Sequence, residues 1–288
     1  MGTRNRFIDW HIIRGWLVLP HAVPIMFVLL ATAAFAFIAT GGHPGAANLA
    51  SLKVAMLGAQ LAIGATNEIV DVDLDRVSKP YKPIPAGLVS TRGAYTVVAT
   101  GLVLMVAGSL RFSLLAGVLC GLGTGIGIAY SIWFKRTILS WLPYILAIPL
   151  LPIWVWVALA DPPVAMVLLY PIAIPALIAV HIAQSIPDHD GDRSAGVHNL
   201  TVALGERRAR ITCWTLMVVS VSIAMLSSLF TSGKPVWCWL TSAAALVLVG
   251  INAWIWRRNR QRGQQTCFPL TAAAVVLTGV GWTVSSLL

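Results

Sequence analysis

The segment AANLASLKVAMLGAQLAIGATNEIVDVDLDR, residues 46–76, joins a long apolar run to a cluster of acidic side chains. A second segment has the same design: VAMVLLYPIAIPALIAVHIAQSIPDHDGDR, residues 164–193, also ends in closely spaced aspartates. Seven of the 10 acidic residues of the chain lie in the ends of these two segments. A carboxylate costs about 2.5–3.5 kcal/mol at the centre of a bilayer. We therefore expect cations to meet these clusters.

The two acidic ends repeat each other in register. NEIVDVDLDR (67–76) and QSIPDHDGDR (184–193) lie 117 residues apart, and their polar positions match. The matched pairs are Asn67 and Gln184, Asp71 and Asp188, Asp73 and Asp190, Asp75 and Asp192, and Arg76 and Arg193. Internal repeats with a site at the interface of the halves are common in membrane proteins. We interpret the chain as two pseudo-repeats, about 12–134 and 138–256, followed by an extra helix at 268–287.

Composition predicts a polytopic membrane protein in one membrane-embedded domain, 1–288. The chain is 58% hydrophobic and 10% charged, with a mean hydropathy of +0.81, far from the average of soluble domains. About 20 apolar residues are needed for a helix to span a bilayer. Nine runs qualify, so we expect an all-α bundle of nine transmembrane helices. The runs are roughly 12–40, 46–69, 91–110, 112–134, 138–160, 163–185, 208–230, 235–256 and 268–287.

The net charge of +10 does not indicate nucleic acid, because the basic residues follow the membrane topology. With nine spans, all of the 20 Lys and Arg residues fall on one face except Lys53, Arg111 and Lys234. The positive-inside rule then places the N-terminus in the cytoplasm. Both acidic segments fall on this cytoplasmic face. We therefore expect an integral protein of the cell (inner) membrane whose site is cytoplasmic.

The spacing of the acidic segments indicates cation binding. Asn67, Asp71 and Asp75 are four residues apart, as are Gln184, Asp188 and Asp192, and this spacing places them on one face of a helix. All-oxygen ligands favour Mg²⁺ or Mn²⁺ over zinc, and Mg²⁺ is commonly held by a few carboxylates together with substrate phosphates. Together with the nearby Lys and Arg residues, the two segments predict a diphosphate bound through metal ions.

A diphosphate at a membrane-embedded site suggests an isoprenoid diphosphate whose tail lies among the apolar helices. Metal ions would stabilise the departing diphosphate and leave an allylic carbocation. Such a cation needs a dry site and favours aromatic faces. The Trp and Tyr residues supply candidates, although the pair Trp154 and Trp156 and the residue Tyr144 cannot be ranked from sequence.

At this point the residues resemble a known family. NEIVDVDLDRVSKPYKPIPAG (67–87) is similar to the first signature of the UbiA superfamily of intramembrane prenyltransferases, and IPDHDGDRSAGVHNLTVALG (186–205) resembles the second. The resemblance implies nine helices, and it implies that two Mg²⁺ ions and the prenyl diphosphate are bound by Asn67, Asp71, Asp75, Asp188 and Asp192. Tyr130 and Lys135 resemble residues of the family that contact the diphosphate. The full set of expected substrate-binding residues is Arg76, Lys79, Lys82, Tyr130, Lys135, Gln184 and Arg193.

Several positions carry more than one interpretation. Glu68 stands where the family has Asp, and Lys82 stands where its loop often has Arg; the second change loses a planar bidentate donor but keeps the charge. Asp73 and Asp190 fall on the other side of each helix, where an ion pair or a helix cap is favoured over ligation. Arg76 and Arg193 could neutralise these carboxylates or bind phosphate.

The function expected from these observations is Mg²⁺-dependent transfer of a prenyl group from a polyprenyl diphosphate to an aromatic or other lipophilic acceptor, with release of diphosphate. No residue selects the acceptor or the donor length. A membrane terpene cyclase of the same superfamily would share the ionisation step and quench the cation internally. A lipid or cation transporter would need accessible sites on both faces, and an inactive binding subunit would not need intact aspartates.

Overall fold

The computed structural model describes residues 15–16, 19, 22–231 and 233–287. Within these residues every regular element is a helix, which confirms the all-α prediction. Eight helical segments are long and apolar enough to cross a bilayer, and a shorter apolar helix covers Ile25–Ala39. These nine segments follow the order of the nine predicted spans. The beginning of the first predicted span, at 12–14, lies outside the described residues.

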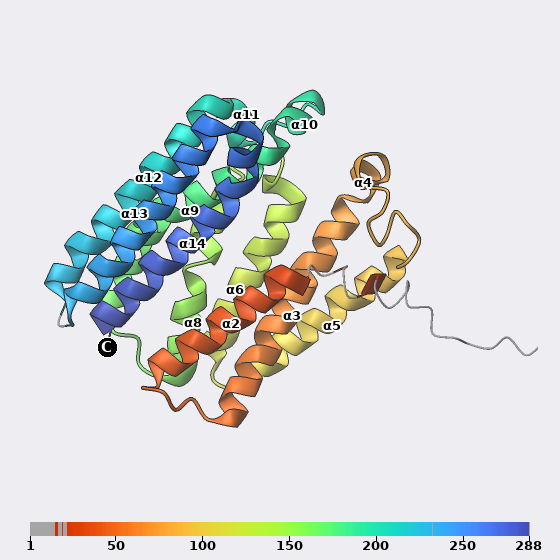
Figure 1. The fold of residues 1–288 in the computed structure, drawn as a ribbon. Helices are drawn as coiled ribbons and strands as arrows, with labels where there is room; N and C mark the ends of the chain where they lie inside the picture. The colour runs from red at the N-terminus through yellow and green to blue at the C-terminus, as the bar shows by residue number, and fades with distance from the viewer. Residues whose placement is uncertain (1–14, 17–18, 20–21, 232, 288) are drawn as a thin grey trace, which may run out of the picture. The chain divides into compact units, whose positions relative to one another are not determined.

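The helices are drawn in Figure 1. Those before residue 160 are α2 (Ala22–Ala39), α3 (Ala46–Val70), α4 (Val72–Ser78), α5 (Thr91–Leu110), α6 (Leu114–Ala129), the π-helix η1 (Tyr130–Phe134), α7 (Leu142–Ala147) and α8 (Leu150–Leu159). Those after it are η2 (Val164–Leu168), α9 (Leu169–Ser185), η3 (Ile186–Asp188), α10 (His189–Ser194), α11 (Leu200–Leu204), α12 (Glu206–Ser227), η4 (Ser228–Phe230), α13 (Pro235–Arg258) and α14 (Arg260–Leu287).

Two predicted spans differ from the helices observed. The fifth span, 138–160, is broken between α7 and α8 at Ile148 and Pro149, where the proline ring and missing N–H interrupt the helical hydrogen bonds. The last helix, α14, begins at Arg260 rather than at 268 and continues through Pro269. Its first turns are polar, so hydropathy alone could not include them.

The described helices form two compact units. Of the described residues, those up to 132 and those in 150–160 form unit 1, and those in 133–149 and from 161 onward form unit 2. In unit 1, α3 packs along α5, and α8 packs on α2 and α6. A Cβ atom at Gly101 would lie 2.9 Å from the backbone nitrogen of Ala62, and one at Gly108 would lie 2.8 Å from that of Ala55. Only glycine lets the two backbones approach this closely, so the position of α3, which carries the first acidic segment, is set by these contacts.

Unit 2 is built on α9, which packs against α12, α14 and α7, while α13 packs along α14. Its core contains Ile182 from α9, Cys213 and Met217 from α12, and Cys267 from α14, each with no exposed surface. These buried contacts hold α9 in place, and α9 leads directly into the second acidic segment.

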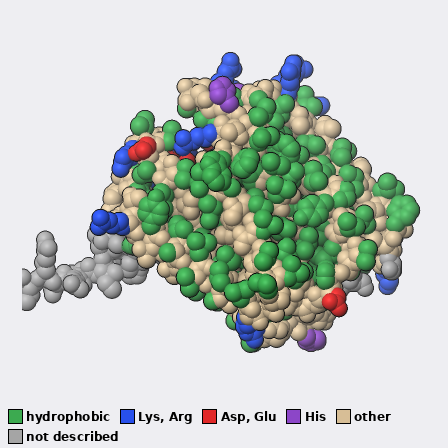
Figure 2. All heavy atoms as spheres, turned by 180° about the vertical axis from the view of Figure 1, so that it is seen from behind, with side chains coloured by type: hydrophobic (Ala, Val, Ile, Leu, Met, Phe, Trp, Pro, Cys, Tyr) green, Lys and Arg blue, Asp and Glu red, His purple; other side chains and the backbone are tan. Residues whose placement is uncertain are grey.

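Apolar side chains also cover the outside of the molecule. Exposed residues include Phe27 of α2, Val103 of α5, Leu122 of α6 and Trp254 of α13, each more than half exposed. Figure 2 shows that apolar side chains dominate the face in view, while most Lys, Arg, Asp, Glu and His side chains gather at its margins. A soluble monomer rarely exposes an apolar surface of this extent. The chain is an integral membrane protein.

Candidate functional site

The first acidic segment lies at a break between two helices. Helix α3 ends at Val70 and α4 begins at Val72, and Asp71 between them has φ −88° and ψ −1°. The hydrogen-bond register nevertheless continues across the break. The amide of Asp71 donates to the carbonyl of Asn67 (3.0 Å), and the amide of Asp75 donates to that of Asp71 (2.8 Å). Asn67, Asp71 and Asp75 therefore follow one another at one-turn intervals, as the spacing predicts.

Three carboxylates of this segment are buried, and a lysine contacts two of them. Asp71 and Asp75 are each 4% exposed, and Glu68 is 2% exposed. The Nζ atom of Lys82 donates to Oδ2 of Asp75 and to Oε1 of Glu68, both at 2.7 Å. Burial lowers the pKa of Lys82, but its hydrogen bonds to Asp75 and Glu68 outweigh burial and raise the pKa above its ordinary value. The lysine is therefore a fixed positive charge inside the acidic segment.

The loop that carries Lys82 is folded against the unit 1 core. The amide of Lys82 donates to the carbonyl of Lys79 (3.0 Å), and that of Ala86 donates to the carbonyl of Lys82 (2.9 Å). Ile84 and Val89 are buried in a cluster that includes Ala65 of α3. These contacts hold the loop in place and direct Lys82 back toward α3 and α4.

Asp73 lies apart from this group. Its carboxylate accepts a hydrogen bond from Arg76 at 2.9 Å, and the side chain is 85% exposed. The preference for an ion pair at Asp73 is confirmed, and Arg76 is the residue that neutralises it.

The second acidic segment also has a break between two α-helices, but this break is longer. Helix α9 ends at Ser185, a short 3₁₀ turn follows, and α10 begins at His189. Asp188 before it has φ −91° and ψ −1°, nearly the angles of Asp71. This sparsely populated region of backbone conformation is where many active-site residues lie. The sequence repeat is thus also a repeat of local structure.

The last aspartate of the second segment also has a partner. Oδ2 of Asp192 accepts a hydrogen bond from Nδ2 of Asn199 at 2.7 Å. The other amide atom of Asn199, Oδ1, accepts from the amide of Val202 at 2.9 Å and caps α11. Asn199 therefore joins the second acidic segment to the helix that follows it. Sequence reasoning missed this residue. Asn199 occupies the position of the second repeat that corresponds to Lys82 in the first, and this match could have identified it.

A cluster of polar side chains precedes the second segment in unit 2. The hydroxyl of Tyr144 donates to Oε1 of Gln184 at 2.8 Å, and the Tyr144 ring meets that of His181 edge-on, 4.9 Å between centroids. His181, 2% exposed, shares a hydrogen bond of 2.8 Å between Nε2 and Oγ of Ser140. Gln184 is therefore oriented by a residue of α7. Spacing alone could not identify Tyr144, because it lies 40 residues away.

The Arg260 side chain, at the start of α14, connects the second acidic segment to α12. Its guanidinium meets both carboxylate oxygens of Glu206, with the shortest contact at 2.7 Å, and it reaches Oδ2 of Asp190 at 3.4 Å. Asp190 also pairs with Nδ1 of His189 at 2.9 Å. The ion-pair interpretation of Asp190 is thus confirmed, with a partner at the start of α14.

Replacing Arg260 by methionine is expected to loosen α10, because one guanidinium joins Asp190 to the first residue of α12. Amide hydrogen exchange over 189–194 should rise several-fold, while turnover should fall only moderately, since exposed ion pairs are weak. Arg262→Met is the matched control, because the Arg262 side chain makes no ion pair in the described part of the chain. Unchanged exchange in the Arg260 variant would show that the contact does not hold α10.

The remaining predicted residues are placed as follows. Tyr130 begins the π-helical turn that ends α6 in unit 1, and Lys135 lies just beyond that turn, in unit 2. Both are half-buried, whereas Lys79 and Arg193 are exposed. π-helical turns often mark functional positions. The contact of these four residues with a diphosphate stays a prediction.

The donor set fits a magnesium ion. Among the described residues, no three His, Cys, Asp or Glu side chains gather as a ready-made cage. Mg²⁺ does not require one, because it keeps waters and substrate phosphate oxygens around one or two carboxylates. Buried Asp71 and Asp75 with the amide oxygen of Asn67, and Asp188 and Asp192 with Gln184, offer hard oxygen ligands only. These residues are therefore compatible with a Mg²⁺-bound diphosphate.

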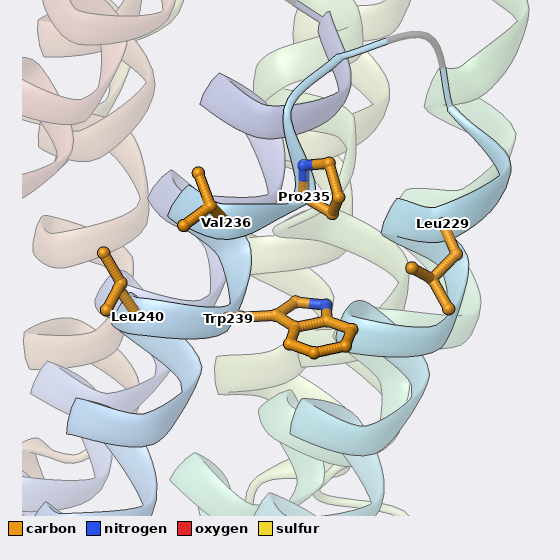
Figure 3. A pocket seen from close by; sticks show the side chains of 5 residues that line it. All are labelled: Leu229, Pro235, Val236, Trp239 and Leu240. Carbon is orange, nitrogen blue, oxygen red and sulfur yellow. The ribbon is translucent and has the colours of Figure 1, made fainter.

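The pocket shown in Figure 3 has an apolar lining, unlike the acidic segments. It is lined by Leu229, Pro235, Val236, Trp239 and Leu240, and the Trp239 ring points toward the side of Leu229. It lies at the end of α12 that is remote from Glu206 and Arg260. With an apolar lining it cannot bind phosphate, so it is separate from the acidic segments.

Comparison with known proteins shows the family of the chain. A model of the UbiA prenyltransferase family matches residues 27–279. Digeranylgeranylglyceryl phosphate synthase of Natronomonas pharaonis is 30% identical over 230 residues, 77% of this chain and 79% of that protein.

Two solved structures share the fold. That of a digeranylgeranylglyceryl phosphate synthase covers 96% of this chain and 99% of its own, with a TM-score of 0.75 and 15% identity. A UbiA homologue of Archaeoglobus fulgidus bound to GPP and Mg²⁺ has a TM-score of 0.65 and 19% identity, covering 94% of this chain and all of its own. Because the family match spans nearly the whole chain, the protein belongs to the UbiA prenyltransferase family.

Proposed function

We propose that this protein transfers a prenyl group from a polyprenyl diphosphate to a lipophilic or aromatic acceptor, with two Mg²⁺ ions, at the cytoplasmic side of the cell membrane. One observation carries the proposal. In each acidic segment the middle aspartate, Asp71 or Asp188, directly precedes the short helix that follows the break and has similar backbone angles, and the last aspartate is held by a nitrogen donor. The Archaeoglobus homologue with GPP and Mg²⁺ supports the ligand chemistry, and the distribution of Lys and Arg supports the orientation.

The chain supplies binding and orientation. Asn67, Asp71 and Asp75, with Asp188 and Asp192, are the metal ligands of the proposal. Bound Mg²⁺ would neutralise the charge that develops on the diphosphate oxygens as they leave. Lys135, Lys79 and Arg193, with Tyr130, would hold the outer oxygens, and the apolar helices would hold the isoprenoid tail out of water.

The reaction balances without another cofactor. The bond between C1 of the allylic chain and the diphosphate oxygen breaks, and its electron pair leaves with the diphosphate. C1 then forms a bond to an oxygen or carbon of the acceptor, which gives up one proton. The oxygen-rich segments act only on the first step, so they do not choose the acceptor.

The test uses membranes that contain the full-length protein, Mg²⁺, and donors of increasing chain length such as geranyl and geranylgeranyl diphosphate. Each donor is combined with an aromatic or a glycerol-phosphate lipid acceptor, and diphosphate and lipid products are measured by mass spectrometry. Acceptor-dependent diphosphate release with a prenylated product is expected. A cyclised hydrocarbon formed without acceptor would identify a terpene cyclase, and cation movement without diphosphate release would identify a transporter. Either outcome would overturn the proposal.

A further inference from the structure

Arginines gather at one end of the three helices α12, α13 and α14 in unit 2. Together these helices contain seven arginines and one acidic residue, Glu206, which pairs with Arg260. Each arginine lies at the start of α12, the end of α13 or the start of α14. They are Arg207, Arg208, Arg210, Arg257, Arg258, Arg260 and Arg262. The positive charge at this end therefore exceeds what the three helices can neutralise.

These arginines also mark the limits of the apolar part of each helix. Arg210, Arg257 and Arg262 adjoin runs that contain no Asp, Glu, Lys or Arg, namely 211–230, 235–256 and 263–287. Apolar side chains beside this limit face outward, since Ile211 is 47% exposed and Trp254 is 58% exposed. Guanidinium groups and hydrocarbon-facing surface thus meet here, as they do at the headgroup level of a bilayer.

One of the arginines, Arg210, is held between two aromatic rings. Its Cζ atom lies 4.9 Å from the ring centroid of Trp256 and 5.4 Å from that of Trp214. The two rings meet edge-on, with 6.4 Å between their centroids. Trp214 is fixed in turn, because its Nε1 atom donates to Oδ1 of Asn252 at 2.9 Å and Asn252 is buried. The aromatic rings therefore fix the position of the guanidinium.

The described part of the chain does not satisfy the hydrogen-bond donors of Arg210. Its Nε atom is buried and has no acceptor, and no described carboxylate forms an ion pair with its guanidinium. Aromatic rings attract the positive charge but supply no oxygen acceptor, and a buried donor without an acceptor is costly. Arginine N–H groups bind phosphate oxygens in pairs. Arg210 thus combines a fixed positive charge with donors that a phosphate group could use.

We propose that this end of α12, α13 and α14 binds the headgroup of an anionic phospholipid, with Arg210 as its main contact to the lipid phosphate. The excess of arginines supplies the complementary charge, and exposed Arg207, one turn before Arg210 on α12, adds a second cation. A lipid fits better than a soluble anion, because its acyl chains can pack beside Ile211 and Trp254. Basic pockets between transmembrane helices commonly bind lipid headgroups. The site uses no proposed metal ligand, so it does not depend on the proposed function.

The experiment measures lipid binding to the purified full-length protein in detergent by native mass spectrometry. The probes are phosphatidylglycerol and phosphatidylcholine with identical acyl chains, titrated separately. We expect phosphatidylglycerol to bind about tenfold more tightly or better, because only its headgroup carries a net negative charge. Arg210→Gln should weaken phosphatidylglycerol binding about tenfold or more, since it removes a charge-assisted pair of hydrogen bonds.

Two further variants separate a specific contact from general charge. Arg208→Gln removes the same charge two residues away, from an exposed side chain that contacts neither Trp214 nor Trp256. Its affinity should stay within about threefold of the parent, as exposed charges contribute little. Arg210→Lys keeps the charge but loses the paired donors, so its affinity should lie between those of the parent and R210Q. The thermal unfolding midpoint shows whether each variant is folded, and R210K carries the test if R210Q is not.

Each of the opposite results would overturn the proposal. Equal binding of the two lipids would show that this surface does not recognise charge, and equal losses in R208Q and R210Q would show a diffuse field instead of a site. Unchanged lipid binding in the folded Arg210 variants would assign Arg210 to packing between the two tryptophans alone. Displacement of phosphatidylglycerol by glycerol phosphate at comparable concentration would identify a soluble phosphate as the ligand.

Discussion

Asp71→Asn and Asp188→Asn should each abolish prenyl transfer while the protein stays folded in the membrane. Each change removes one negative charge from the middle of an acidic segment and keeps the shape of the side chain. We expect turnover to fall by about a thousandfold or more, which corresponds to about 4 kcal/mol in the activation barrier. The measurement is diphosphate release under saturating donor, acceptor and Mg²⁺.

The neighbouring aspartates provide matched controls. Asp73→Asn and Asp190→Asn make the same chemical change two residues from the proposed ligands, but these two carboxylates are paired with Arg76 and Arg260. Both should retain most of the turnover. If either middle-aspartate variant kept full activity, its segment would not take part in the reaction. If the controls lost as much, the effect would come from general charge and not from ligation.

Removal of divalent cations should have an effect of similar size. Chelation by EDTA is expected to stop diphosphate release completely, since two acidic segments without a bound cation would repel the donor diphosphate. Mg²⁺ or Mn²⁺ should restore the rate, because both accept all-oxygen ligands. Thermal unfolding in detergent, followed with and without EDTA, checks that the helices remain folded.

Persistence of turnover after dialysis against EDTA would contradict this expectation. It would mean that Lys and Arg side chains alone stabilise the departing diphosphate. Titration with Mg²⁺ at several donor concentrations then tests whether the metal enters with the donor or is bound beforehand. Only a metal that enters with the donor makes the apparent affinity for Mg²⁺ depend on the donor concentration.

Local patterns were enough to predict much of this protein. Long apolar runs predict helices because backbone groups in a bilayer must be satisfied within the segment. The i, i+4 spacing of Asn67, Asp71 and Asp75 survives the helix break, since the backbone hydrogen bonds continue through it. The preference of Asp73 and Asp190 for ion pairs also followed from their position on the opposite side of the turn.

Contacts between distant residues could not be predicted in this way. The spacing suggested phosphate for Lys82, but the folded loop directs its ammonium to Glu68 and Asp75. Arg260 reaches Glu206 across 54 residues and Asp190 across 70, and Tyr144 reaches Gln184 across 40. These separations along the sequence follow neither the helical nor the strand period, so a local sequence pattern could not reveal the contacts.

The helical class, the order of the membrane-spanning segments and the duplicated acidic residues could be predicted from the order of residues, because each depends on neighbours within a few turns. The side chain that neutralises or orients each carboxylate became known from the folded structure. Those pairings depend on how α3 packs on α5 and how α9 packs on α12 and α14. Packing of this kind is set by side-chain shape across helices, and not by the order of residues within one of them.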